Sequence, residues 1–300
     1  MKAVQFDEYG DPDVLHVSEV DEPHAGPGQV RIKVAAAGVN AIDWKLRSGH
    51  MREQMPLDFP AGTGVDASGV VDEVGNGVAD VAVGDAVFGS GSATCADYAV
   101  LTFWAAKPDS LSFEEAAGYP IPVETAIRIL DQVGIRSGQT LLVSGASGGV
   151  GSAAVQIARD RGITVIGTAG AANQDYVRSL GATPVAYGDG LVERVRALAP
   201  AGVDAALDIA GSGVVPDLIE LTGEPTRVLS IADFTAPEQG AMVSTTPVNQ
   251  KAAFQEAARL FTAGKLSIPV QQSFPLEAAA QAHATSAAGH VVGRLVITTD

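Results

Sequence analysis

A stretch near the middle of the chain, LLVSGASGGVGSAAVQIARDRG at 141–162, joins an apolar run, a turn of small residues and a helix-like segment. Gly145, Gly148 and Gly151 are spaced three apart, with Gly149 between the last two. Residues without side-chain bulk let backbone N–H groups approach an anion, and the N-terminus of the following helix adds partial positive charge. This chemistry is typical of a dinucleotide pyrophosphate site, although the spacing departs from G-x-G-x-x-G.

The end of the next strand indicates which dinucleotide fits. NAD-preferring folds often place an acidic residue there, about 20 residues after the turn, to bind the ribose 2′-hydroxyl. In this sequence residues 167–169 carry no charge. Because no carboxylate opposes a 2′-phosphate, the sequence favours NADP(H), with Thr168 and Asn173 as candidate phosphate ligands. Arg178 is either a third ligand or a solvated residue on a helix face.

The elements around the turn predict a layered α/β domain, because segments of strand and helix character alternate from residue 122 onward. Such alternation implies right-handed βαβ units and a Rossmann-type doubly wound parallel sheet. The expected strands are 139–146, 163–169, 183–187, 203–210 and 226–232, and the expected helices are 122–134, 149–162, 173–181, 190–200 and 249–264.

The first 110 residues have a different rhythm, with short β-rich runs separated by glycine- and proline-containing turns. Strands at this spacing predict a compact β-barrel or sandwich. Ser112 and Glu115 form a capping-box signal for a short helix. The tail adds a further helix and a last strand at 293–299. The β-rich runs are 2–6, 29–39, 68–74 and 85–89.

Composition restricts the class of protein. Apolar residues make up 46 % of the chain, enough for a full core, and the net charge of −16 argues against nucleic-acid binding and against anionic membranes. The one cysteine, Cys95, allows neither an internal disulfide nor a C-x-x-C zinc site. No apolar run reaches the roughly 18 residues that span a bilayer, and the N-terminus lacks a signal-peptide core. We therefore expect a cytoplasmic protein.

Taken together, these motifs resemble the zinc-free quinone oxidoreductase branch of the medium-chain dehydrogenase/reductase superfamily. The resemblance covers essentially the whole chain and rests on MKAVQFDEYGDPDVLHV, AAAGVNAIDWKLRSG, ASGVVDEVGNGV, GDAVFG, LLVSGASGGVGSAAVQIA, RSLGA, ALDIAGSG and GHVVGRLVIT. It implies a GroES-like β-barrel catalytic domain formed by 1–120 and 268–300. An NADP(H)-binding Rossmann domain at 121–267 would be inserted between these two parts.

The same resemblance bears on zinc. Zinc alcohol dehydrogenases of the superfamily carry a ligand cysteine where this chain has Asn40, and a ligand histidine where it has Val65. Neither side chain replaces a thiolate or an imidazole around zinc. We therefore expect no metal, and hydride transfer to an acceptor whose charge spreads into an enolate or hydroquinone rather than alcohol oxidation.

The resemblance also implies site residues. Asn40 and Asp43 are expected near the nicotinamide, where each either contacts substrate or holds the loop. Lys45 stands where relatives often carry tyrosine, and it is either a hydrogen-bond donor to substrate or an exposed lysine. No residue is a clear proton donor. The cofactor residues implied by the glycine turn, the strand ends and the family pattern are Thr125, Ser147, Gly148, Gly149, Val150, Thr168, Asn173, Tyr187, Ala210, Ser230, Ile231 and Arg294.

The function expected from the sequence is NADPH-dependent reduction of a quinone or α,β-unsaturated carbonyl compound. One alternative is an enoyl reductase that modifies a biosynthetic, polyketide-like intermediate. A second alternative is a non-catalytic NADPH-binding sensor, since the tyrosines found in relatives are missing. Family members often pair through edge strands of the nucleotide domain, so we also expect a homodimer.

Overall fold

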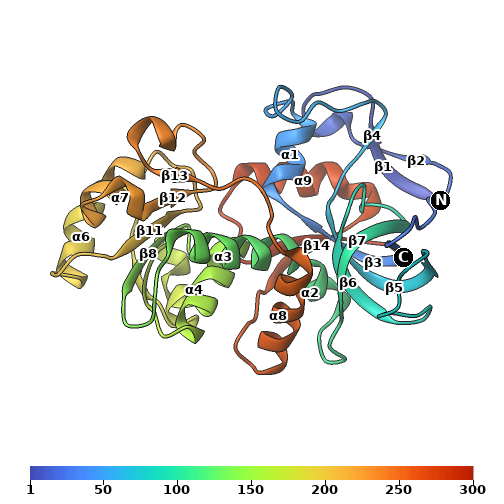
Figure 1. Ribbon diagram of the computed structural model, residues 1–300. Coiled ribbons are helices and arrows are strands. Elements are labelled where there is room, and N and C mark those ends of the chain that lie inside the picture. The colour runs from blue at the N-terminus through green and yellow to red at the C-terminus, as the bar shows by residue number, and fades with distance from the viewer. Residues whose placement is uncertain (300) are drawn as a thin grey trace. The chain divides into compact units, whose positions relative to one another are not determined.

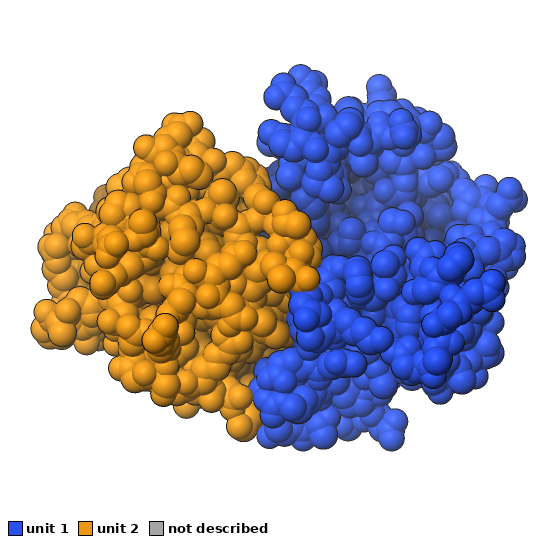
Figure 2. All heavy atoms as spheres, in the orientation of Figure 1, with its two compact units in different colours: residues 1–121, 249–263, 268–300 blue, residues 122–248, 264–267 orange. Residues whose placement is uncertain are grey.

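The structure, a computed structural model, describes residues 1–299, which divide into two compact units (Figure 2). Unit 1 contains residues 1–121 and 249–263 together with the described residues from 268 onward. Unit 2 contains residues 122–248 and 264–267. No helix among the described residues is both long and apolar enough to cross a membrane.

Unit 1 is built mainly from antiparallel strands (Figure 1). Its larger sheet has the order β14-β15-β3-β5-β6-β7, and an additional pairing of β7 with β3 closes four of these strands into a barrel. The smaller sheet has the order β2-β1-β4. The strands are β1 (Lys2–Phe6), β2 (His16–Glu19), β3 (Val30–Val39), β4 (Ala61–Gly62), β5 (Asp66–Val74), β6 (Ala86–Gly91), β7 (Tyr98–Ala106), β14 (Val270–Pro275) and β15 (Arg294–Thr298).

The long strand β3 allows the barrel to close. Its first residues, from Val30 to Lys33, pair with both β5 and β7, whereas its last residues pair with β5 and β15. Two register shifts against β5 interrupt the ladder, and such irregularities bend a strand and increase its twist. Apolar side chains of β3, β5, β6 and β7 fill the barrel interior. The predicted β-barrel is thus confirmed, although strands β2, β4, β7 and β14 were not predicted.

Four helices belong to unit 1: α1 (Ala41–Arg47), α2 (Phe113–Ala117), α8 (Gln250–Thr262) and α9 (Ala279–Ala288). The predicted capping box is present in α2, since the Glu115 backbone N–H donates to Ser112 Oγ (3.2 Å) and Glu115 Oε2 accepts from the Ser112 backbone N–H (3.2 Å). A second apolar cluster joins α9 and β15 to β1. It includes Cys95, which is 2 % exposed.

Helix α8 packs in unit 1, whereas the domain bounds predicted from sequence placed 249–263 with the nucleotide-binding domain. A buried aromatic contact holds α8 there. The ring centroids of Phe254 on α8 and Phe88 on β6 are 6.3 Å apart. Lys251 adds an ion pair with Asp80 (2.6 Å) and lies over the Trp104 ring. Sequence alternation gave no signal of these partners, which lie more than 100 residues away.

Unit 2 contains a parallel sheet with the order β10-β9-β8-β11-β12-β13. In chain order this is 3-2-1-4-5-6, the doubly wound arrangement predicted from the alternation of strands and helices. Its elements are α3 (Pro120–Val133, whose first two residues belong to unit 1), β8 (Thr140–Ser144), α4 (Gly149–Asp160), β9 (Thr164–Thr168), α5 (Gln174–Ser179), β10 (Thr183–Val185), α6 (Leu191–Leu198), β11 (Ala205–Asp208), α7 (Val215–Thr222), β12 (Val228–Ser230) and β13 (Met242–Val243).

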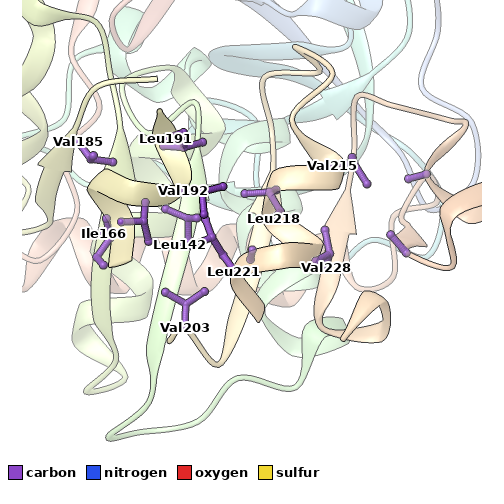
Figure 3. Packing of buried hydrophobic residues seen from close by; sticks show 14 residues of the cluster. Leu142, Ile166, Val185, Leu191, Val192, Val203, Val215, Leu218, Leu221 and Val228 are labelled. Atoms are coloured by element: carbon purple, nitrogen blue, oxygen red, sulfur yellow. The ribbon is translucent and has the colours of Figure 1, made fainter. Parts of the chain in front are cut away.

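Helices α6 and α7 cover one face of this sheet (Figure 3). Leu191 of α6 and both Leu218 and Leu221 of α7 gather over Leu142 and Ile166 of the central strands, and all five are nearly fully buried. Burial of this apolar face is what holds the helices on the sheet.

Helix α7 was not predicted, although its ends carry recognisable signals. Pro216 stands in the first turn, where its missing N–H costs nothing. Gly223 follows the helix in the left-handed region (φ +72°), which favours glycine.

Candidate functional site

In the glycine turn after β8, each of the three spaced glycines has a separate structural role. Gly145 adopts φ +84°, which lets the chain turn sharply at the strand end. A Cβ on Gly151 would lie 2.1 Å from the Gly145 carbonyl oxygen, so only glycine lets α4 approach the strand this closely. At Gly148, in contrast, the nearest atom to such a Cβ is 3.9 Å away. The open side of the turn is therefore at Gly148, next to the N-terminus of α4, where an anion can approach backbone N–H groups.

Thr168, at the end of β9, holds this turn. Its hydroxyl accepts a hydrogen bond from the Gly145 backbone N–H (3.0 Å), and its carbonyl oxygen accepts one from Ala146 (3.1 Å). The residue is only 2 % exposed. The structure thus gives Thr168 a role in shaping the turn, which differs from the phosphate ligand that the sequence predicts.

Replacing Thr168 with valine should lower the free energy of unfolding by about 1–2 kcal/mol, because the Gly145 N–H loses its buried acceptor. Serine keeps the hydroxyl and is the matched control. Urea unfolding of the wild type and both variants measures the effect. Equal stability of the valine variant and the wild type would show that this hydrogen bond does not hold the turn.

The region after β9 and β10 contains the predicted adenosine-end residues. Asn173 donates its backbone N–H to the Gly170 carbonyl oxygen (2.9 Å) just before α5 begins. A Cβ on Gly170 would lie 3.4 Å from the Tyr187 hydroxyl, so this tyrosine, which is 53 % exposed, sits beside the end of β9. Arg178 instead forms an exposed ion pair with Asp175 on the same helix. Asn173 and Tyr187 are therefore close to the same strand end.

The ends of β11 and β12 are fixed by a small polar network. Asp208 accepts hydrogen bonds from the Gly211 N–H (2.9 Å) and from the Ser230 hydroxyl (2.8 Å). The Ser230 hydroxyl oxygen in turn accepts from the N–H groups of Ala232 (3.1 Å) and Asp233 (2.9 Å). Ser230 is fully buried, so it organises the backbone of this strand end rather than offering its own side chain to a ligand.

Thr125, on α3, is connected to the same edge of the sheet. Its hydroxyl accepts a hydrogen bond from Arg128 Nη2 (3.3 Å), and Arg128 Nη1 donates to Ser244, which directly follows β13. The Ser244 N–H donates to the Ser230 carbonyl oxygen (3.0 Å). The predicted cofactor residues that the structure gathers at or next to the carboxyl edge of unit 2 are Thr125, Ser147, Gly148, Gly149, Val150, Thr168, Asn173, Tyr187, Ala210, Ser230 and Ile231.

In unit 1, Asn40 and Asp43 form the start of α1. Asn40 is the N-cap residue, and its backbone N–H donates to Asp43 Oδ2 (2.7 Å), as in a capping box. The Asn40 side-chain amide is engaged on both sides, since Nδ2 donates to Asp66 (3.0 Å) and Oδ1 accepts from Arg294 (2.9 Å). Of the two roles expected for Asn40, this geometry favours holding the loop, with one amide N–H left over.

Asp66 and Arg294 complete this buried polar cluster, which we define as Asn40, Asp43, Asp66 and Arg294. Asp66 is fully buried, forms an ion pair with Arg294 (3.5 Å), and also accepts from the backbone N–H of Ile121 (3.2 Å). Arg294 was expected beside the cofactor. The structure places it at the start of β15, 6 % exposed, with its guanidinium on Asn40 and Asp66.

Two carboxyl groups and one guanidinium share the cluster, and burial disfavours each charged form. Burial raises the pKa of Asp43 to about 7, while the Asn40 N–H bond lowers it and the Asp66 charge raises it. Burial raises the pKa of Asp66 to about 6 against the lowering effects of Arg294 and Asn40. Near neutral pH the cluster therefore holds its protons more tightly than isolated carboxyl groups do.

Lys45, the third expected catalytic residue, is half-buried on α1 with Nζ 5.8 Å from the centroid of the Trp44 ring. Burial lowers its pKa. Two kinds of residue near these sites were not predicted from the sequence. Asp66 directly follows Val65, and its signal is an acidic residue at the start of an apolar strand. Glu124 and Arg128 flank Thr125 on α3, and their one-turn spacing was the available signal.

Comparison with known proteins is consistent with this architecture. Residues 26–105 match the family described as alcohol dehydrogenase GroES-like domain, and residues 180–297 match the family described as zinc-binding dehydrogenase. A chloroplastic quinone oxidoreductase of Triphysaria versicolor is 34 % identical over an alignment of 326 positions, gaps included, covering 99 % of this chain and 98 % of that protein.

Solved structures agree in fold over the whole chain. The quinone oxidoreductase from Coxiella burnetii has a TM-score of 0.88 and 31 % identity, covering 100 % of this chain and 99 % of its own. A mycobacterial protein solved in complex with NADPH has a TM-score of 0.85 and 28 % identity, covering 99 % of this chain and 100 % of its own. The chain is therefore an oxidoreductase that belongs to the quinone oxidoreductase branch of the medium-chain dehydrogenase/reductase superfamily.

Proposed function

We propose that the protein is an NADPH-dependent, zinc-independent reductase that transfers hydride to a quinone or an α,β-unsaturated carbonyl compound. The observation that carries this proposal is the glycine turn, where Gly148 leaves open space beside the N-terminus of α4. The mycobacterial structural relative was solved with NADPH, which supports a nicotinamide dinucleotide as the cofactor.

The preference for NADPH rests on the end of β9. Its last residue, Thr168, is followed by Ala169 and Gly170, so no carboxylate stands where it would repel a 2′-phosphate. Asn173 and Tyr187 lie beside this strand end as polar partners. The hydroxyl and amide groups would bind the phosphate by hydrogen bonds rather than by charge.

Zinc independence rests on residue types. Asn40 and Val65 stand where zinc-dependent relatives carry cysteine and histidine, and neither offers a thiolate or imidazole. Among residues 1–299, no group of three or more histidine, cysteine, aspartate or glutamate side chains is placed to hold a metal ion. Instead Asn40 is held between Asp66 and Arg294 by two hydrogen bonds.

In the proposed reaction, residues of unit 2 would bind the cofactor and residues of unit 1 would contact the acceptor. Reduced nicotinamide, when bound, supplies the hydride. The turn from Ser147 to Val150 would bind the pyrophosphate through backbone N–H groups, and Thr125 would orient the nicotinamide end. In unit 1, Asn40 keeps one amide N–H for an acceptor oxygen. Lys45, with its pKa lowered by burial, is the candidate that delivers a proton to the reduced acceptor.

The proposal is tested by titrating the purified protein with NADPH and NADH and then adding a panel of quinones and enones, with nicotinamide absorbance as the readout. We expect tighter binding of NADPH and oxidation that depends on the acceptor. Binding without oxidation by any simple acceptor would favour an enoyl reductase with a narrow biosynthetic substrate. No binding of either nucleotide would overturn the assignment of the glycine turn.

We further propose that two copies associate through unit 2. Strand β13 is the last strand of its sheet, and Val243 on it is 36 % exposed. Such an edge presents unpaired backbone groups to which a second copy can add a strand.

A further inference from the structure

Helix α3 contains a buried ion pair that the proposed mechanism has not used. Glu124 and Arg128, one turn apart, are 4 % and 8 % exposed. Arg128 Nε donates to both carboxylate oxygens of Glu124, at 3.1 and 3.2 Å. Burial of two charges costs free energy that their attraction only partly restores, so such a pair adds little stability compared with apolar residues. Its value lies in what it holds in place.

The ion pair links helix α3 to the segment 244–248, which also belongs to unit 2. Glu124 Oε1 accepts a hydrogen bond from the Val248 N–H (3.0 Å), and Arg128 Nη1 donates to the Ser244 hydroxyl. Both ends of the segment 244–248 are thereby fixed to α3. The remaining guanidinium nitrogen, Nη2, donates to the Thr125 hydroxyl (3.3 Å).

These contacts determine the direction of the Thr125 hydrogen bond. A guanidinium has N–H donors and no acceptor, so the Thr125 oxygen must accept from Arg128. The Thr125 O–H is then free to donate to another group, and it requires an acceptor as its partner. In a nicotinamide ring the carboxamide offers a carbonyl oxygen as acceptor and an NH₂ group as donor. Only the carbonyl oxygen matches a donating hydroxyl.

We propose that Arg128, held by Glu124, is a positioning residue that makes Thr125 a hydrogen-bond donor to the nicotinamide carboxamide oxygen. This inference rests on the proposed function, in which Thr125 meets the nicotinamide end. It assigns orientation of the nicotinamide ring to a buried ion pair that does not itself touch the cofactor.

The affinities for three nucleotides distinguish this positioning role from a purely structural role. NADPH carries the whole carboxamide, its 3-acetylpyridine analogue keeps the carbonyl but lacks the NH₂ group, and 2′-phospho-ADP-ribose lacks the ring entirely. We expect the wild type to bind NADPH and the acetylpyridine analogue with similar affinity. Thr125→Val should weaken both by about tenfold, the usual effect of one lost hydrogen bond to a polar ligand, and leave 2′-phospho-ADP-ribose unchanged.

The decisive variant removes the ion pair and keeps Thr125. Glu124→Leu with Arg128→Leu leaves no lone buried charge, so the fold should persist. We expect this double variant to reproduce the pattern of Thr125→Val, and the triple variant to show no further loss, because both changes remove one coupled interaction. Replacing the exposed pair Glu256 and Arg259 on α8 by glutamine is the matched control and should change none of the affinities.

The outcomes are distinguishable. Equal weakening of all three nucleotides by the double leucine variant, or additive losses in the triple variant, would overturn the positioning role and leave a structural one. Failure of the wild type to bind any of the three would instead overturn the proposed function. Thermal unfolding of each variant, followed without nucleotide, verifies that the affinities compare folded proteins.

Discussion

Replacing Gly148 with aspartate should leave the fold intact and weaken NADPH binding by about 100-fold or more. A Cβ at this position would meet no atom closer than 3.9 Å, and the backbone at φ −76° and ψ 175° suits aspartate at a helix N-cap. The new carboxylate would however stand at the helix N-terminus, where the pyrophosphate is expected to bind. Two anions cannot share that position without strong repulsion.

Asparagine at position 148 is the matched control, because it has the same shape and the same capping ability without the charge. We expect the asparagine variant to lose about tenfold or less in affinity. Titration with NADPH by fluorescence, together with urea unfolding, measures both properties. Normal NADPH binding by the aspartate variant would contradict the assignment of the turn as the pyrophosphate site.

Replacing Arg294 with methionine should cost about 3–5 kcal/mol of unfolding free energy at pH 8, because it leaves Asp66 and Asp43 buried without their cation. The loss should be smaller at pH 5. Both carboxyl groups have folded-state pKa values above their ordinary value of 3.8, at about 6 and about 7, so the folded state binds more protons between pH 4 and 7. Stability therefore falls as pH rises through this range.

Removal of the guanidinium steepens this fall, because Arg294 has the largest lowering effect on the pKa of Asp66, ahead of Asn40 and the Ile121 N–H. The double variant Arg294→Met with Asp66→Asn should recover most of the stability at pH 8. Urea unfolding of the wild type and both variants at pH 5 and pH 8 measures these effects. A loss that is the same at both pH values would show that packing of the arginine side chain, rather than its charge, stabilises the cluster.

The glycine turn could be predicted because its evidence is local. The spacing of Gly145, Gly148 and Gly151 between a strand and a helix lies within one short stretch, and the physical demand on each glycine acts on near neighbours. The parallel sheet was likewise predictable from the alternation of elements along the chain. Short elements such as β13, with two residues, carry too little periodicity to be read from sequence.

The buried polar groups were harder to predict, because their partners are far away in sequence. Arg294 reaches Asn40 across 254 positions, and Arg128 reaches Ser244 across 116. Sequence gives the residue type but not the partner, and the partner decides whether an arginine binds a ligand or a carboxylate. Thr168 shows the same limit, since its hydroxyl is engaged by Gly145, 23 residues before it.

The burial of Cys95 bears on the electrophilic quinone and enone acceptors proposed above. Thiolates add to the electrophilic carbons of quinones and enones, so a protein that binds such compounds repeatedly exposes its own cysteines to covalent modification. This chain has one cysteine, which is 2 % exposed, and burial together with the neighbouring Asp43 charge raises the pKa of its thiol. Because the thiolate is the reactive form, the folded protein would offer the proposed quinone or enone acceptors no nucleophilic cysteine sulfur.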